Sequence, residues 1–250
     1  MSDWLKFQAG FDVHGDQQDA KACKVFFDFA RDWKPDVRVM GGDLFDFRPI
    51  RRKAGEEERR ESMRADFEAG IEWLKEFKPN HYLRGNHCER LWELAAADKG
   101  VESDYAFQGI HEIETLTARL KCKVYPYHKK KGVARLGTTL SIIHGFASGV
   151  NCARETARQY SAGTVLFGHV HVIDSHSTAS LDRRVAHCCG CLCDLDMPYA
   201  ARSPGTLRQA HGFAYGVVHK KTGKHHVWLA EGQAGKWVIP SDVVEYGGAK

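Results

Sequence analysis

The sequence of 250 residues contains no long apolar run, no repeat and no low-complexity tract. A membrane span requires about 18 uninterrupted apolar residues, so we predict no transmembrane segment and no membrane partner. The N-terminus, from Met1 to Trp4, also lacks the basic and then apolar pattern of a secretion signal, and we therefore expect a cytoplasmic protein. Because no linker-like stretch divides the chain, a single domain over residues 1–250 is the simplest prediction.

An excess of charge of one sign is also missing. Lys and Arg total 36 and Asp and Glu total 32, which leaves a formal charge of +4. So small a charge permits a nucleic-acid partner without requiring one. With 43% apolar and 27% charged residues, the composition is that of a globular protein and excludes disorder as the main state.

Histidine and cysteine, by contrast, are abundant, with 14 and 8 residues. Both bind metals, and histidine is also the commonest acid or base near neutral pH. A disulfide framework is not expected in a chain of this length without an export signal. One segment lacks the two separate C-x-x-C pairs that are usual in structural zinc sites, and adjacent thiols on a strand face opposite sides. We therefore favour reduced, partly buried thiols over a structural zinc site there. The segment contains His187, Cys188, Cys189, Cys191 and Cys193.

Hydrophobic periodicity predicts alternating strands and helices, and hence an α/β protein with parallel strands. The predicted strands are residues 4–11, 37–40, 81–83, 123–127, 138–143, 164–167, 213–219 and 225–229. The predicted helices are residues 20–33, 63–77, 89–97 and 151–160, with residues 100–120 helical in part. The charge-dense residues 48–60 predict an exposed loop.

Five of the predicted strands end in Asp, Asn or His, usually beside a Gly that lets the backbone turn. Ligand sites of parallel α/β sheets lie outside the carboxyl ends of the strands, so we expect these side chains to converge. They are Asp12, His14, Asp43, Asp46, Asn86, His87, His144, His169 and His171. This set of oxygen and nitrogen ligands without a thiolate suits manganese, iron, zinc, cobalt or nickel. With Asp43 as a bridge, it is large enough for two ions about 3.5 to 4 Å apart.

The order and strand-end positions of these residues resemble the motifs of the calcineurin-like metallophosphoesterases, which are D-x-H, G-D-x-x-D, G-N-H, a lone H and G-H-x-H. The resemblance covers Asp12 to His171 and implies an α/β sandwich, with two mixed β-sheets packed together and flanked by helices. It further implies that one metal is held by Asp12, His14 and His171, and the second by Asn86, His144 and His169, with Asp43 shared. His87 would face the leaving group, and Asp46 would orient its ring.

The activity implied by the resemblance is hydrolysis of a phosphoester by a hydroxide that bridges two divalent ions. Manganese is the expected metal, with iron, zinc, cobalt or nickel as alternatives. His87, as an imidazolium, would protonate the leaving group. Some proteins keep this fold only as a binding scaffold, but these generally lack the histidine of G-N-H. Because His87 is present, we expect an enzyme.

The substrate is less constrained than the chemistry. Phe47 stands where the family's protein phosphatases have a phosphate-binding Arg, and those enzymes lack G-H-x-H, so a phosphoprotein substrate is disfavoured. Without that clamp, a diester with one negative charge is favoured over a dianionic monoester. A metal-dependent DNA nuclease and a small-molecule phosphomonoesterase are the alternatives, since Gly41–Asp46 resembles the family's DNA-repair nucleases. Cys88 departs from the family pattern by replacing the acid after G-N-H, although Glu89 is adjacent.

Two basic runs bear on a nucleic-acid partner. The residues Lys129, Lys130 and Lys131 are expected to form a solvated face. The run Arg48, Arg51, Arg52 and Lys53 has the same main interpretation, but it follows the strand of Asp43 and could attract a phosphate-bearing polymer. The sequence leaves the physiological substrate and the oligomeric state open.

Overall fold

The structure is a computed structural model that describes residues 3–160, 163–179, 181, 183–197, 204–233 and 235–239. Its α-helices are α1 (Ala20–Trp33), α2 (Glu56–Arg59), α3 (Met63–Phe77), α4 (Glu89–Ala95), α5 (Val101–Arg119) and α6 (Cys152–Gln159). The first strands are β1 (Trp4–Gly10), β2 (Val37–Met40), β3 (His81–Leu83), β4 (Lys123–Tyr125), β5 (Ala134–Leu136) and β6 (Leu140–Ile142). The later strands are β7 (Gly163–Phe167), β8 (Ile173–Ser177), β9 (Arg184–Cys189), β10 (His211–His219), β11 (His225–Gln233) and β12 (Lys236–Val238).

The strands form two mixed sheets. The first has the order β12-β11-β10-β1-β2-β3-β4, in which β1 to β4 are parallel and β10 to β12 are antiparallel to their neighbours. The second has the order β5-β6-β7-β9-β8, with a parallel centre of β6, β7 and β9 and antiparallel edges. The predicted fold class, two mixed sheets flanked by helices, is confirmed.

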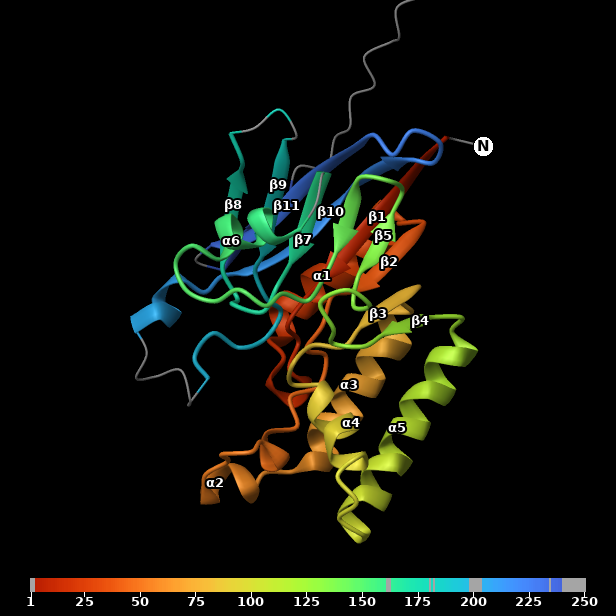
Figure 1. The fold of residues 1–250 in the computed structure, drawn as a ribbon, viewed down its shortest axis with the longest axis vertical. Helices are drawn as coiled ribbons and strands as arrows, with labels where there is room; N and C mark the ends of the chain where they lie inside the picture. The colour runs from red at the N-terminus through yellow and green to blue at the C-terminus, as the bar shows by residue number, and fades with distance from the viewer. Residues whose placement is uncertain are drawn as a thin grey trace, which may run out of the picture.

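Three of the four apolar clusters among the described residues lie between the layers. One core lies between the sheets and joins residues such as Phe7 and Phe11 to Leu140 and Leu166. A second packs the other face of the first sheet against α1, α3, α4 and α5, and a third packs the second sheet against α6. Figure 1 shows α3, α4 and α5 gathered on one flank and α6 on another, so each sheet has one face on the shared core and one under helices.

Helices α1 and α3 have the predicted bounds because their start and stop signals are local. The side chains of Asp19 and Ser62 accept hydrogen bonds from backbone N–H groups of the first turns of α1 and α3. Each helix ends at a residue with left-handed backbone, Lys34 and Lys78, and a proline follows one position later.

The strands that were not predicted are β5, β8, β9 and β12. Three of these, β5, β8 and β12, lie at sheet edges, where short and partly exposed strands carry a weak hydrophobic pattern. The predicted loop over residues 48–60 contains the short helix α2, and residues 100–120, predicted as helical in part, form the continuous helix α5. The fourth, β9, lies inside the second sheet and was also missed, so local periodicity was insufficient for the edges and for one interior strand.

Three further predictions concern the chain as a whole. Among the residues that the structure describes, no helix is both long and apolar enough to cross a membrane. The single domain over residues 1–250 includes residues 240–250, which lie outside the described ranges, and stays a prediction. The cytoplasmic location also stays a prediction.

Candidate metal centre

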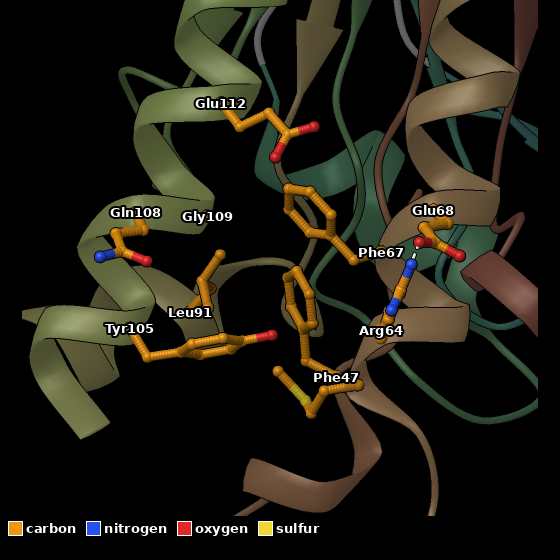
Figure 2. A pocket seen from close by; sticks show the side chains of 10 residues that line it. Phe47, Arg64, Phe67, Glu68, Leu91, Tyr105, Gln108, Gly109 and Glu112 are labelled. Carbon is orange, nitrogen blue, oxygen red and sulfur yellow. Dashed lines mark hydrogen bonds and ion pairs between the residues drawn. The ribbon is translucent and has the colours of Figure 1, made fainter. Parts of the chain in front are cut away.

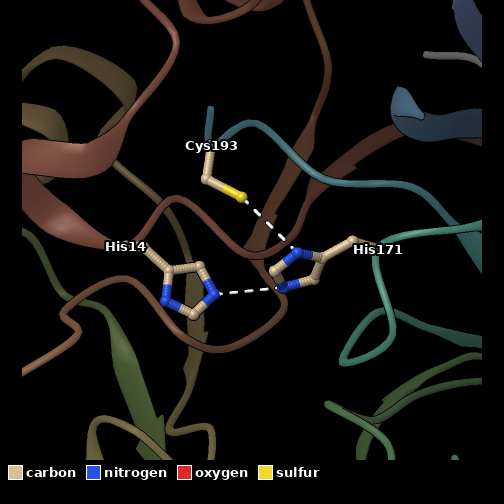
Figure 3. Close-up of side chains that lie close together, drawn as sticks. All are labelled: His14, His171 and Cys193. Carbon is tan, nitrogen blue, oxygen red and sulfur yellow. Dashed lines mark hydrogen bonds between the residues drawn. The ribbon is translucent and has the colours of Figure 1, made fainter. Parts of the chain in front are cut away.

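The first group of predicted ligands lies where β1 and β7 end. The imidazole nitrogens Nε2 of His14 and His171 are 3.1 Å apart, and Figure 3 shows the two rings turned toward each other. The Oδ1 atom of Asp12 lies 3.6 Å from Nε2 of His171 and 4.0 Å from Nε2 of His14. The three side chains predicted to hold one metal therefore do converge.

The second group lies at the ends of β3, β6 and β7. The Oδ1 atom of Asn86 is 3.0 Å from Nε2 of His144 and 2.9 Å from Nδ1 of His169. The Oδ2 atom of Asp43, which follows β2, is 3.0 Å from the same nitrogen of His144. The three side chains predicted for the second metal thus meet beside the predicted bridging carboxylate.

Asp43 lies between the two groups. In the described part of the chain, three sets of side chains have ligand atoms within 4.8 Å of one another: His14, Asp43 and His87; Asp43, His144 and His169; and His14, His171 and Cys193. Asp43 belongs to two of these sets, the position expected of a bridging ligand. Two members, His87 and Cys193, were not predicted as ligands, and both have other partners, described below.

These side chains fit a divalent cation. The Oδ1 atom of Asp12 is completely buried and has no hydrogen-bond partner, which is costly for a carboxylate unless a cation faces it. Two nitrogens bound to one ion at about 2.1 Å lie about 3 Å apart, which matches the separation of the His14 and His171 nitrogens. The oxygen and imidazole donors are those that borderline divalent ions prefer.

The backbone at the centre is strained. Five of the predicted ligands, Asp12, His14, Asp43, His169 and His171, have positive φ angles between 49° and 73°. Residues other than glycine rarely adopt this conformation, and it costs about 1 to 3 kcal/mol at each position. Such strain persists at functional sites, where it aims side chains that an ordinary strand end would point elsewhere.

Backbone N–H groups hold the carboxylates in place. His87 N donates to Oδ1 of Asp43 at 2.8 Å, and His169 N donates to Oδ2 of Asp12 at 2.8 Å. Glycines make this approach possible: a Cβ atom on Gly85 would lie 2.0 Å from Oδ1 of Asp43, and one on Gly168 would lie 2.2 Å from Oδ2 of Asp12. These two motif glycines are therefore required for close approach, rather than for the sharp turn expected from the sequence.

The charges of the centre compensate one another. Burial opposes ionisation of Asp43, but the imidazoles of His144 and His87 outweigh it and hold the pKa of this carboxyl well below its usual range. Burial likewise disfavours a cationic His171, yet the carboxylate of Asp12 raises its pKa to about 9. A divalent cation would therefore replace protons on these imidazoles, and its affinity should rise with pH.

His87 is held by Asp46 beside this centre. Its Nδ1 atom is hydrogen-bonded to Oδ1 of Asp46, and its Nε2 atom lies 4.0 Å from Oδ2 of Asp43. The buried carboxylate of Asp46 also contacts Arg48 Nη1 at 3.1 Å and Arg90 Nη1 at 3.2 Å. Asp46 therefore fixes the His87 ring with one nitrogen directed toward the centre, the orientation predicted from the sequence.

The loop that carries Asp46 is held in place by a second buried acid, Asp66 on α3. Its two carboxylate oxygens accept hydrogen bonds from the backbone N–H groups of Asp46 at 3.1 Å and Phe47 at 2.7 Å. Burial raises the pKa of Asp66 to about 6, although these two hydrogen bonds oppose the shift. The loop is thus held by a group that no motif contains.

A model of the calcineurin-like phosphoesterases matches residues 12–173, which is more than half of the chain. The chain belongs to the calcineurin-like phosphoesterase family. The match spans all nine predicted site residues, from Asp12 to His171. Membership supports metal-dependent hydrolysis of phosphoesters, for which the ligand groups described above provide the donors.

Several solved structures are similar to this chain at low sequence identity. Vacuolar protein sorting 29 from Cryptosporidium parvum is 12% identical, with a TM-score of 0.48 over 95% of this chain and 96% of that one. YfcE, a phosphoesterase from E. coli, is 13% identical, with a TM-score of 0.40 over 88% and 96%. A phosphatase from Mycoplasma pneumoniae is 11% identical, with a TM-score of 0.44 over 92% and 95%. No curated protein matches the chain.

The cysteine segment of this calcineurin-like phosphoesterase is buried. All eight cysteines are free, and Cys188, Cys189, Cys191 and Cys193 have no exposed surface. Cys188 faces the core under α6 and Cys189 the core between the sheets, which confirms that neighbouring thiols point to opposite sides. Cys193 Sγ lies 3.6 Å from Nδ1 of His171 (Figure 3). Among the described residues, Cys193 is the member of this segment that belongs to a group of possible metal ligands, and that group also contains His14 and His171. The preference for reduced thiols over a structural zinc site stays a prediction.

Phe47, which replaces the Arg of the protein phosphatases, points away from the metal centre. Its ring is fully buried and stacks on Phe45 with centroids 5.2 Å apart. It lines a cavity of about 270 Å³ between α3, α4 and α5, where Figure 2 shows it next to Phe67 and opposite Tyr105. Glu89, next to the departure at Cys88, pairs with Arg84 at 3.1 Å.

Sequence reasoning missed four residues that support the centre: Asp66, Arg90, Cys193 and Tyr127. One had a recognisable signal, because Asp66 is a charged residue among the apolar positions of the amphipathic helix α3. The Tyr127 hydroxyl donates to the Gly145 carbonyl at 3.0 Å, and its ring lies 5.7 Å from that of His144. No local pattern reveals the other three, since their partners are distant in sequence.

Proposed function

We propose that this calcineurin-like phosphoesterase hydrolyses phosphodiesters at a centre of two divalent ions, with manganese as the metal. The observation that carries the proposal is the position of Asp43 between two groups of ligand atoms, with His87 beside it and held by Asp46. Two-metal hydrolytic sites share this arrangement of a bridging ligand and separate terminal ligands.

When bound, the two ions would neutralise charge on the phosphoryl oxygens and lower the pKa of a water molecule. The chain's own residues would hold the carboxylates in place, orient His87 and supply a proton. Asp12 and Asp43 present carboxylates that backbone N–H groups hold in fixed positions. Asp46 accepts a hydrogen bond from Nδ1 of His87, so that the imidazolium form of His87 can give its Nε2 proton to the leaving oxygen. Such proton transfer typically contributes 10² to 10⁴ in rate.

The charges around His87 support a diester over a monoester. A cavity of about 150 Å³ beside His87 is lined by three arginines, Arg48, Arg51 and Arg90. All three are paired with carboxylates: Arg48 and Arg90 with Asp46, and Arg51 with Glu58. No unpaired guanidinium among these residues is available to clamp the second negative charge of a monoester.

The test combines metal analysis with paired substrates. Asp43→Asn should lower the metal content after manganese reconstitution and abolish hydrolysis of bis-nitrophenyl phosphate, as should chelation of the wild type. Asp32→Asn, at an exposed position of α1, is the matched control and should retain both properties. Less than one equivalent of metal in the reconstituted wild type would overturn the proposal.

The alternative of a small-molecule phosphomonoesterase is decided by the same assay. The proposed activity requires that bis-nitrophenyl phosphate is cleaved at least as efficiently as nitrophenyl phosphate. A clear preference for the monoester, with kinetics insensitive to salt, would assign the centre to a phosphomonoesterase instead. The nuclease alternative is favoured by a specific surface beside the centre, described next.

A further inference from the structure

A cleft of about 750 Å³ lies on the outer face of the second sheet, beside the C-terminal end of α6. Its lining includes Lys129 and Lys130 from the loop between β4 and β5, and Arg135 from β5. Arg135 lies on the outer face of β5, because its neighbours Ala134 and Leu136 point into the core between the sheets. The rings of Phe146 and Tyr160 supply the aromatic part of the lining.

Among the residues that the structure describes, no acid neutralises the cations of this cleft. No Asp or Glu is among its described lining residues. Within the described part of the chain, no carboxylate forms an ion pair with Lys129, Lys130 or Arg135. Fixed cations without counter-charge in a concave surface attract anions.

Packed aromatic rings connect the wall of the cleft to the metal centre. Phe146 follows His144 by two residues, and its ring stacks on that of Tyr127 with centroids 4.6 Å apart. The Tyr127 ring in turn contacts that of His144, with centroids 5.7 Å apart. Two successive ring contacts therefore connect the aromatic wall of the cleft to a predicted metal ligand.

We propose that this cleft binds an unpaired nucleotide of a single-stranded nucleic acid whose scissile phosphodiester lies at the metal centre. Lys129, Lys130 and Arg135 bind phosphates, and the Phe146 ring, supported by Tyr127, stacks on a base. A single strand is required because bases paired in a duplex have no free face for stacking. This inference rests on the proposed phosphodiesterase function and names its substrate class.

Binding is tested by fluorescence anisotropy with a labelled oligothymidylate of about 12 nucleotides, on the full chain in the presence of a chelator so that no cleavage occurs. Lys130→Glu should weaken binding and reduce the slope of log affinity against log salt by at least about 0.7. Lys131→Glu is the matched control, because Lys131 is exposed in the same loop but does not line the cleft. It should retain most of the affinity.

The aromatic part is tested separately with Phe146→Leu, which keeps an apolar side chain but removes the stacking surface. Loss of one base–aromatic stack should weaken binding about 5- to 150-fold. With manganese present, both Phe146→Leu and Lys130→Glu should lower the kcat/KM for the oligonucleotide relative to that for bis-nitrophenyl phosphate.

The outcomes separate the two proposals. If the wild type does not hydrolyse bis-nitrophenyl phosphate, the phosphodiesterase function fails. If it does so but does not bind the oligonucleotide, or if Lys130→Glu and Lys131→Glu bind it equally, the assignment of the cleft is overturned. A duplex of the same length that binds as tightly as the single strand would overturn it as well.

Discussion

Two basic segments lie near the metal centre, and they differ in the number of carboxylates around them. Near Arg48, carboxylates surround the cations: Arg48 is 8% exposed and pairs with Asp16, Asp46 and Glu61. The cleft beside it is also lined by Glu56, Glu57 and Glu58. The cleft at Lys129, Lys130 and Arg135 has no such acids among its described residues.

The difference shows that the role of a cation depends on its neighbours in space. In the sequence, the run from Arg48 to Lys53 was the better candidate for contact with a phosphate polymer, because it follows the strand of Asp43. In the structure, Arg48 instead stabilises Asp46, which holds His87. We call the segment near Arg48 the Arg48 side and the cleft at Lys129, Lys130 and Arg135 the Lys130 side. The Arg48 side holds the residues that orient His87, and we propose that the Lys130 side binds the substrate.

The largest effect is expected on the Arg48 side, in turnover. His87→Ala should lower kcat about 10²- to 10⁴-fold on a diester with a poor leaving group, because no acid remains to protonate the departing oxygen. A nitrophenyl diester, which needs little protonation, should lose less, and the metal content should not change. Steady-state kinetics on both substrates check this. Equal losses would mean that His87 positions the substrate instead of donating a proton.

The next largest effect is expected on the free energy of unfolding, which should distinguish the two sides. Arg48→Met should lower the free energy of unfolding by about 3 kcal/mol, since it leaves buried carboxylate charge without its guanidinium. Arg135→Met removes the same charge from an exposed strand position and should change the free energy by less than about 0.5 kcal/mol. Urea denaturation measures both. Similar values for the two variants would remove the structural distinction between the sides.

A third effect is the pH dependence of stability, which Asp66 should confer on the Arg48 side. Its pKa is raised from 3.8 to about 6 by burial, so the folded state retains a proton that the unfolded state releases. The retained proton adds about 2 to 3 kcal/mol to the free energy of unfolding below pH 4. This stabilisation is lost as the pH rises through about 6. Asp66→Asn should remove this loss, so its stability relative to wild type should improve between pH 4 and pH 7.

Urea denaturation at several pH values, with chelator present, measures the difference between Asp66→Asn and the wild type. Asp32→Asn, exposed on α1, is the control and should follow the wild type. Parallel curves for Asp66→Asn and the wild type would show that Asp66 does not titrate in this window.

The smallest effect is expected when one cation on the Arg48 side loses its acidic partner and so resembles the cations on the Lys130 side. Glu58→Gln removes the partner of Arg51 and should increase the salt slope of oligonucleotide binding by up to about 0.7, because one cation becomes free. Glu57→Gln makes the same change in charge at an exposed position in the same helix, without freeing Arg51. Anisotropy titrations over a range of salt compare them. Equal slopes would mean that pairing does not control attraction of the strand.

The parts that could be predicted from the sequence are those whose signals are local. Helices α1 and α3 have their caps, apolar faces and terminating prolines within their own segments. The site residues Asp12, Asp43, Asn86, His144 and His169 each stand at a strand end inside a short motif. The supporting residues could not be predicted, because Asp66 contacts Asp46 from 20 residues away and Cys193 contacts His171 from 22 residues away.

The sequence by itself determined which side chains can form the metal centre, because parallel strands bring their carboxyl ends to one edge of a sheet. The packing of the two sheets then brought the ends of β1, β2 and β3 together with those of β6 and β7. Only the tertiary structure decided which charges remain available. Arg48 and Lys130 carry the same charge, but the fold places Asp16, Asp46 and Glu61 against the first and, among the described residues, no acid against the second. Electrostatic energy depends on the distance between charges, and that distance is set by folding.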